Sequence, residues 1–193
     1  MSKPTLSILS SSIRPERKSH RVALYFESYI NQHNLADVEI LDLREFQFPL
    51  FKNRLSVQKQ PEDTLLDFSS KIQKSDGIIV VTPEYNGGIP AALKNAIDVL
   101  YDEWQKKPIA ISTVSSGQLA GSNCMAALQF TLWKIGALMT FKTFPVSKIE
   151  EKYSEDGTPI NKTESDDLAN IFIKDLLAMV AQKDINEKEP PSF

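Results

Sequence analysis

Cysteine and histidine are scarce in this sequence, and long apolar runs are missing from it. The lone cysteine, Cys124, excludes an internal disulfide and gives no sign of a small, disulfide-stapled secreted fold. The two histidines, His20 and His33, are not grouped with cysteines or carboxylates at the spacing of metal ligands, so no metal site is predicted. No apolar stretch reaches the length needed to cross a bilayer, and we expect no insertion into a membrane.

Several functional motifs are missing as well. The sequence has no G-x-S-x-G elbow of a hydrolase, no G-x-x-x-x-G-K-[ST] loop of an NTPase and no strand-borne G-x-G-x-x-G of a separate dinucleotide site. The N-terminus lacks a basic segment followed by a long apolar one, so no secretory signal is predicted. A cytoplasmic location is the resulting expectation.

Composition and charge are those of an ordinary globular protein. Hydrophobic residues make up 41% and charged residues 24%, and the net charge of -3 argues against binding to nucleic acid. A chain of 193 residues can bury a sizeable core as one domain, which we place at residues 1–183. Residues 184–193 are predicted to form a disordered tail.

Strand and helix patterns alternate along the chain. The alternation shows no repeat and no linker, which predicts one doubly wound α/β sandwich with helices on both faces. Thr163 is predicted to cap the last helix, with Asp166 three residues further on. Strands are predicted at 5–9, 37–43, 78–81, 108–114 and 138–144, helices at 17–33, 62–74, from 90, at 122–136 and from 163, and loops at 46–60 and 150–161.

The stretch from Asp76 to Leu100 carries the strongest pattern. The β-branched run 78–81 is typical of a strand buried on both faces in a parallel sheet. A polar loop, 82–89, follows it, and Pro90 suits the first turn of a helix. Loops at the carboxyl ends of strands in open α/β sheets bind ligands. The helix is predicted to bury one apolar stripe, made of Leu93, Ala96, Ile97, Leu100, Tyr101 and Trp104.

The composition of this loop suits a planar, hydrogen-bonding ligand such as a flavin ring. Pro83 sets the path of the chain out of the strand, and Gly87 and Gly88 permit positive φ and close approach of the backbone. The alternative is a plain tight turn with a half-buried tyrosine. Aromatic or polar groups that could face such a ring come from Glu84, Tyr85 and Asn86.

The same residues resemble the signature of the NADPH-dependent FMN reductase family, a flavodoxin-like group that includes quinone, azo and chromate reductases. The family pattern is a strand, P-E-Y-N, one or two small residues and then P-x-x-L-K-N-A-I-D. This sequence has P-E-Y-N at 83–86 and P-A-A-L-K-N-A-I-D at 90–98. The resemblance covers most of residues 5–145.

The resemblance implies a flavodoxin-like five-stranded parallel sheet with the strand order 2-1-3-4-5. In that topology the loops after strands 1, 3 and 4 open on one edge of the sheet. These loops are 10–19, 82–89 and 115–121, and small, hydroxyl and glycine residues concentrate in them. The agreement between topology and composition predicts one pocket.

The first of these loops is interpreted as a phosphate cradle. Its serines at 10–12 supply hydroxyl groups, and the following helix aims backbone N–H groups at the pocket. Cations at the start of a helix oppose its dipole, so four of them in one place indicate that an anion binds among them. The alternative, a solvated basic face, fits Lys18 and Arg21 better than it fits Arg14. The four cations in question are Arg14, Arg17, Lys18 and Arg21.

The resemblance assigns FMN contacts position by position. Ser11 stands where the family has glycine, and we expect it to tighten the turn or shift a backbone N–H. The phosphate contacts implied are Ser12, Arg14, Arg17, Lys18 and Ser19. The ring contacts implied, chiefly through the backbone, are Pro83, Glu84, Tyr85 and Asn86, and Ser115 and Gly117 match the third loop in position.

The function implied is that of an FMN-dependent NAD(P)H oxidoreductase. NADPH or NADH would deliver hydride to the flavin, and a quinone, azo compound, metal oxyanion or free flavin would then take the electrons. The flavin carries this chemistry, so no catalytic side chain is assigned. The sequence leaves the acceptor open, and also the choice between NADPH and NADH.

Two other functions stay open. A flavodoxin-type carrier would bind FMN and pass single electrons to protein partners, but such carriers usually have a T-x-T-G-x-T loop and a strongly acidic surface. A regulatory protein of the same fold would bind no flavin. The basic first loop favours the reductase.

Members of the family pair through the helix after P-E-Y-N and its neighbour, so a homodimer or a dimer of dimers is expected. Tyr101, Trp104 and Trp133 are surplus aromatic residues that fit either an interface or the core. The segment 46–55, with Phe48 and Phe51, is a candidate cover for a neighbouring subunit's site. Cys124 is predicted to be a small buried hydrophobe and not a reactive thiol.

Overall fold

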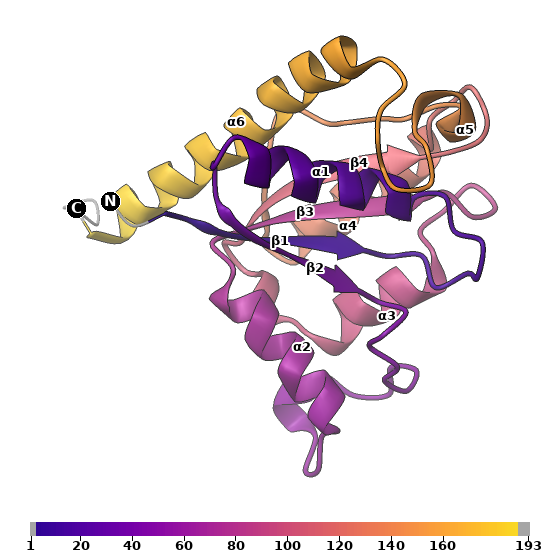
Figure 1. Ribbon diagram of the computed structural model, residues 1–193. Helices are drawn as coiled ribbons and strands as arrows, with labels where there is room; N and C mark the ends of the chain where they lie inside the picture. The colour runs from indigo at the N-terminus through magenta and orange to yellow at the C-terminus, as the bar shows by residue number, and fades with distance from the viewer. Residues whose placement is uncertain (1–2, 189–193) are drawn as a thin grey trace.

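The computed structural model describes residues 3–188, and a five-stranded parallel sheet forms its centre (Figure 1). The strand order is β2-β1-β3-β4-β5, which confirms the predicted topology. All pairs are parallel, so the strands end at one edge, on the right in Figure 1. The strands are β1 (Thr5–Ser10), β2 (Asp37–Asp42), β3 (Gly77–Pro83), β4 (Pro108–Val114) and β5 (Leu138–Met139).

Helices cover both faces of the sheet because the central strands are apolar on both sides. Successive residues of β3 point to opposite faces: Ile79 packs into the cluster under α1 and α6, and Ile78 into the cluster over α2, α3 and α4. The predicted inward face of the first helix, from Val22 to Ile30, is buried as expected. The helices are α1 (His20–Gln32), α2 (Asp63–Lys74), α3 (Ala91–Val99), α4 (Ser122–Lys134), α5 (Ile149–Lys152) and α6 (Lys162–Lys188).

The last strand is much shorter than the predicted 138–144. After Met139 the chain bulges outward, and Phe141 is 86% exposed. The backbone N–H of Lys142 donates to Asp175 of α6 and not to β4, at 2.7 Å. Pairing with β4 resumes where Phe144 N–H donates to Ile111. A period-two pattern in the sequence cannot show this interruption.

The third helix and the aromatic residues beyond it also differ from the prediction. α3 ends at Val99, and a 3₁₀ turn, η2 (Asp102–Trp104), follows it. Trp104 is fully buried in the core. Tyr101 lies under the Arg54 guanidinium, which is 3.9 Å from its ring centroid. Trp133 is 63% exposed, so of the three surplus aromatics it is the one presented to solvent.

The loop 150–161 and the start of the last helix also differ from the prediction. The predicted loop 150–161 begins with α5, and α6 begins at Lys162. Its cap is Asn161 and not Thr163: Asn161 Oδ1 accepts from the Glu164 N–H at 3.3 Å, and its amide donates to the Glu164 carboxylate at 2.9 Å. The cap lies two residues earlier than predicted, and it differs from a capping box because the Asn161 side-chain amide, and not its backbone N–H, donates to Glu164. α6 continues through Lys188, across the start of the predicted tail, and residues 189–193 lie outside the described residues.

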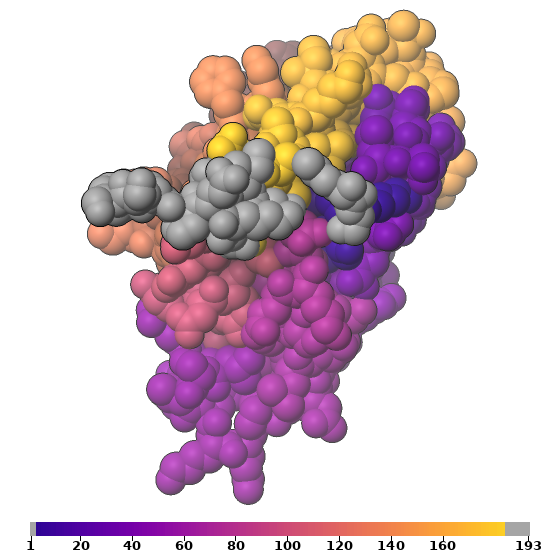
Figure 2. Space-filling view, turned by 90° about the vertical axis from the view of Figure 1, so that its left-hand side faces the viewer, coloured from indigo at the N-terminus to yellow at the C-terminus, as the bar shows by residue number. Residues whose placement is uncertain are grey.

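The stretch after β2 extends away from the sheet at the bottom of the molecule (Figures 1 and 2). It contains one 3₁₀ turn, η1 (Leu55–Val57). Asn95 of α3 anchors it, accepting from the Phe51 N–H at 2.6 Å and donating to the Pro49 carbonyl at 3.0 Å. Among residues 3–188, no helix is long and apolar enough to cross a membrane.

Two glycines with the same backbone conformation allow packing to be separated from strain. Gly157 (φ +84) lies against α1, where a Cβ would meet the Arg21 carbonyl oxygen at 2.6 Å and the Leu24 Cβ at 2.8 Å. Gly136 (φ +85) ends α4, and its added Cβ would meet only Gln105, at 3.8 Å. We expect Gly136→Ala to lower the free energy of unfolding by about 1 kcal/mol through the left-handed conformation alone.

Gly157→Ala should cost about 1–3 kcal/mol more than Gly136→Ala, because the methyl group must also push α1 aside. Urea unfolding of both variants measures the difference. Equal losses of stability would show that α1 does not pack against Gly157 as described.

Candidate functional site

The loops after β1, β3 and β4 line one cavity of about 270 Å³. Nine of the predicted site residues contribute to its wall, whereas Asn86 and Gly117 do not. The structure therefore brings together three segments that lie up to a hundred residues apart in the chain. The predicted residues in the wall are Ser12, Arg14, Arg17, Lys18, Ser19, Pro83, Glu84, Tyr85 and Ser115.

Tyr85 joins the first loop to the second. Its hydroxyl is hydrogen-bonded to Ser12 Oγ at 2.6 Å. The Arg14 guanidinium lies 5.8 Å from the centroid of the Tyr85 ring, within the range of a cation–π contact. The aromatic group and the cation predicted for the two ends of a flavin ligand therefore share one cleft.

The loop after β3 is a tight hairpin. The Tyr85 N–H donates to the Gly88 carbonyl at 3.1 Å, and the Gly88 N–H donates back to Tyr85 at 3.0 Å. Asn86 (φ 50) and Gly87 (φ 74) both have positive φ, which defines a type I′ turn. Asn86 stands exposed at the tip, away from the cavity wall. The Tyr85 N–H is taken by this turn and is not free for a ligand.

The Glu84 carboxylate is directed to the start of α4. It accepts from the Cys124 backbone N–H at 3.0 Å and from the Asn123 amide at 3.4 Å. A carboxylate at a helix N-terminus satisfies a free donor and complements the helix dipole. Glu84 therefore connects the second loop to α4 through these two hydrogen bonds.

Arg17 is paired with Asp42 at the end of β2. The guanidinium donates two hydrogen bonds to the Asp42 carboxylate and one to the Ser12 carbonyl, at 3.0 Å. Both side chains of the pair are 10% exposed. Burial acts to raise the pKa of Asp42, but the hydrogen bonds from Arg17 and from the Arg44 N–H outweigh it and hold that pKa below its ordinary value. Arg17 thus fixes the shape of the first loop.

His20 closes the base of the same loop. Its Nδ1 is hydrogen-bonded to Ser10 Oγ at 2.9 Å. Burial lowers the pKa of His20, and the neighbouring Arg17 lowers it further, so the imidazole is neutral at pH 7.

Among the described residues, no group of three or more His, Cys, Asp or Glu side chains is arranged to hold a metal ion.

The other cations of the first loop differ in their partners. Lys18 pairs with Glu150, which also accepts from Ser116 Oγ at 3.1 Å. Arg21 donates to the Tyr153 carbonyl at 2.9 Å, lies 3.6 Å from Glu155 and is absent from the cavity wall. Within residues 3–188, Arg14 has no carboxylate partner.

Among the side chains that the structure describes, two buried hydroxyl groups have no hydrogen-bond partner: Ser11 Oγ and Ser19 Oγ. Buried polar groups are nearly always paired in native proteins. Ser19 is 3% exposed and lines the cavity, so a phosphate oxygen there would satisfy it. Ser11 is not among the residues with positive φ, so serine causes no backbone strain at this position. The donor set of the first loop fits a phosphate ester.

Four residues of the cavity wall were not among the predicted site residues: Glu16, Val114, Ser116 and Ile149. Glu150, which pairs with Lys18 of the wall, was missed as well. Ser116 was part of the predicted third loop but was not singled out. Ile149 follows the broken last strand, and its N–H donates to the Ser115 carbonyl at 3.1 Å. No local signal in the sequence connects Ile149 with a loop more than thirty residues earlier.

Cys124 behaves as the sequence predicted. It is fully buried, and burial raises the pKa of its thiol to about 11. The thiol therefore stays protonated at neutral pH.

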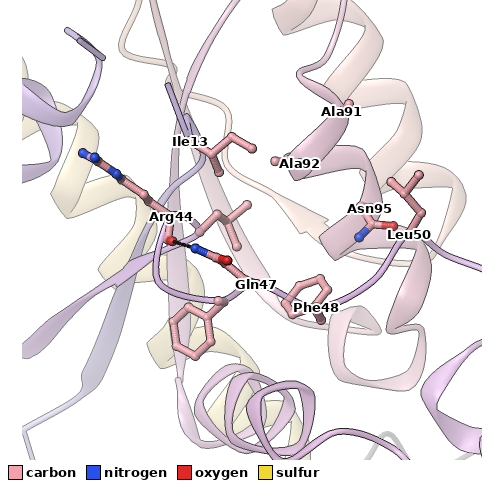
Figure 3. Close-up of a pocket in the computed structure, with 10 residues that line it drawn as sticks. Ile13, Arg44, Gln47, Phe48, Leu50, Ala91, Ala92 and Asn95 are labelled. Carbon is pink, nitrogen blue, oxygen red and sulfur yellow. Dashed lines mark hydrogen bonds between the residues drawn. The ribbon is translucent and has the colours of Figure 1, made fainter. Parts of the chain in front are cut away.

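A second cavity, of about 510 Å³, lies beside the first (Figure 3). In Figure 3, Ile13 of the first loop lies at the upper side of this cavity, facing Ala92 of α3, and Phe48 and Leu50 of the stretch after β2 lie lower. The Arg44 guanidinium points away from Ala92, to the left in Figure 3. This cavity is mainly apolar and contains none of the predicted site residues.

Known proteins with similar sequences are reductases. The family model for NADPH-dependent FMN reductase matches residues 4–151. An NAD(P)H-dependent FMN reductase of Schizosaccharomyces pombe is 30% identical over 154 residues, which are 76% of this chain and 76% of that protein. A quinone reductase of Pseudomonas putida is 32% identical over 155 residues, covering 77% of this chain and 76% of that one.

A solved structure shares the fold. FerB, a flavoenzyme NAD(P)H:(acceptor) oxidoreductase from Paracoccus denitrificans, superposes with a TM-score of 0.75 at 22% identity. The alignment covers 94% of this chain and 99% of that one. At this identity the likeness is evidence for the fold alone.

The buried Arg17–Asp42 pair makes stability depend on pH. The pKa of Asp42 is lower in the folded than in the unfolded protein, so the pair stabilises the fold above the ordinary aspartate range, and this is lost as the pH falls through the folded-state pKa. Asp42→Asn should lower the free energy of unfolding by about 1–3 kcal/mol at pH 7. The gap between wild type and variant should narrow as the pH is lowered to about 3.

Glu39→Gln is the matched control, because Glu39 lies on the same strand and pairs with Lys71 at the surface, with the two side chains 42% and 33% exposed. It should change stability by less than about 1 kcal/mol. Urea unfolding of wild type and both variants between pH 7 and about pH 3 measures these differences. A difference in the free energy of unfolding between wild type and Asp42→Asn that stays constant with pH would contradict the lowered pKa of Asp42.

Proposed function

The chain belongs to the NADPH-dependent FMN reductase family, and on that premise we propose that it oxidises NADPH or NADH through FMN held in the three-loop cavity, and reduces a small acceptor such as a quinone, azo compound, metal oxyanion or free flavin. FMN supplies the hydride and electron chemistry when it is bound. The residues of this chain bind, orient and shield that group.

The observation that carries the proposal is the unpaired Ser19 hydroxyl in the cavity wall. It shares that wall with Ser12 and with Arg14, a cation with no carboxylate partner among the described residues. A phosphate ester supplies the acceptor that Ser19 lacks and the negative charge that Arg14 lacks. We assign the phosphate end of FMN to these residues.

The flat part of the ligand is assigned to the second and third loops. Pro83, the half-buried Tyr85 and Ser115 all line the cavity. The I′ turn and the bond between Tyr85 and Ser12 fix the position of this wall before a ligand arrives, which lowers the ordering cost of binding.

We also propose that the chain pairs with a second copy through α4. Phe130 and Trp133 lie on its outer side, are 65% and 63% exposed, and their ring centroids are 5.9 Å apart. Aromatic residues are enriched in the buried centre of protein interfaces. A cytoplasmic location remains a prediction from the sequence.

The absorption spectrum of the purified protein, followed by anaerobic addition of NADPH, tests the function. We expect a yellow protein, or one that turns yellow with added FMN, whose flavin band bleaches with NADPH and recovers with a quinone. FMN that binds but is not reduced by NADPH would favour an electron carrier. Protein that stays colourless with added FMN would overturn the proposal.

Ser19→Ala tests the phosphate assignment. Loss of one hydrogen bond to a charged group costs about 1.5–3 kcal/mol, so the Kd for FMN should rise by about tenfold or more. Ser11→Ala is the matched control, since Ser11 Oγ is also buried and unpaired but does not line the cavity. Equal effects of the two changes on the Kd would exclude a direct contact of Ser19 with the phosphate.

A further inference from the structure

The two ion pairs at the cavity wall differ in how easily they can be exchanged. Arg17 and Asp42 are 10% exposed and share two hydrogen bonds, so separating them would leave buried charge unpaired. The side chains of Lys18 and Glu150 are 43% and 40% exposed. An exposed pair contributes little and can exchange one partner for another ion. Lys18–Glu150 is therefore the pair that an incoming anion can replace.

Glu150 also receives a group from the third loop. Its Oε1 accepts hydrogen bonds from Lys18 Nζ and from Ser116 Oγ. Lys18 and Ser116 both line the cavity, and they belong to different loops. One carboxylate oxygen thus takes up a cation and a hydroxyl that border the cavity beside the unpaired Ser19 hydroxyl.

The carboxylate is not needed to hold its own segment in place. The Lys148 N–H donates to the Gly117 carbonyl and the Ile149 N–H to the Ser115 carbonyl, each at 3.1 Å. Ile149 is 1% exposed and belongs to the core under α1. These backbone bonds and this burial dock the segment on the third loop without any contribution from the Glu150 side chain.

Glu150 is an anion at neutral pH. The hydrogen bond from Lys18, together with one from its own backbone, holds the pKa of Glu150 below its usual value. Glu150 therefore places a negative charge beside the phosphate cradle.

We propose that Glu150 is an internal competitor of the FMN phosphate: it occupies Lys18 and Ser116 in the ligand-free protein, and the phosphate displaces it on binding. The inference rests on the proposed function, because it takes the cavity to be the FMN site. The released carboxylate returns to water, to which it is already 40% exposed. The competition weakens binding of the phosphorylated flavin and leaves riboflavin, which has no phosphate, unaffected.

The test compares the Kd values of wild type, Glu150→Gln and Glu151→Gln for FMN and for riboflavin, by quenching of flavin fluorescence. Glu151 is the matched control: its change removes the same charge one residue away, but Glu151 pairs with Lys148 and not with a cavity residue. Glu150→Gln should tighten FMN binding about threefold, the scale of an exposed ion pair. Riboflavin binding should not change, and Glu151→Gln should leave both Kd values as in wild type.

A second arm shows whether the gain acts through Lys18. In the Lys18→Gln background, Glu150→Gln should no longer tighten FMN binding, because the cation over which the two anions compete is gone. A tightening that persists there would overturn the competition.

Three further results would overturn the inference. Weaker FMN binding by Glu150→Gln would make Glu150 a support for the loops, and an unchanged Kd would leave it no part in binding. Equal tightening by Glu150→Gln and Glu151→Gln would reduce the effect to net charge. Failure of the wild-type protein to bind FMN at all would instead contradict the proposed function, and with it this inference.

Discussion

The site depends on where the strand order of the sheet reverses. β1 and β3 are neighbours in the sheet but are separated in the chain by α1, β2 and α2, so the connections leaving them run to opposite faces and their loops part at the carboxyl edge. The β4 loop lies next to that opening. Three segments with little in common as sequence are thereby held around one cavity. The hydrogen bond between Ser12 and Tyr85 closes the gap between the first two.

Charge within the first loop is arranged in two ways. Arg17 is neutralised permanently by Asp42 and holds the backbone at Ser12, so its role is to shape the cradle. Arg14 and Lys18 lie at the surface, where a ligand can reach them, and only Lys18 already has a carboxylate beside it. Cations at a helix start oppose its dipole, and carboxylates offset this for Arg17, Lys18 and Arg21. The cations thus have separate tasks, which their spacing alone does not reveal.

The alternation of apolar patterns predicted the doubly wound sandwich and the three loops, whereas the strand order came from the resemblance to the family. In the stretch from Asp76 to Leu100, positive φ falls on Asn86 and Gly87, whereas Gly87 and Gly88 were expected to adopt it. The buried strand and the amphipathic helix of that stretch were predictable, since each has a clear apolar pattern. The bulge at Phe141 was not, because it depends on a contact between Lys142 and Asp175 across the fold. The destination of the Glu84 carboxylate, the start of α4, was hidden for the same reason.

The central claim is that one cavity holds both ends of FMN, with the phosphate at Ser12 and Ser19 and the ring against Tyr85. A crystal structure of the protein with FMN bound tests this most directly. The account predicts phosphate oxygens within hydrogen-bond distance of both serine hydroxyls and the ring between the loops that follow β3 and β4. FMN seated instead in the apolar cavity between Ile13 and Phe48 would contradict it.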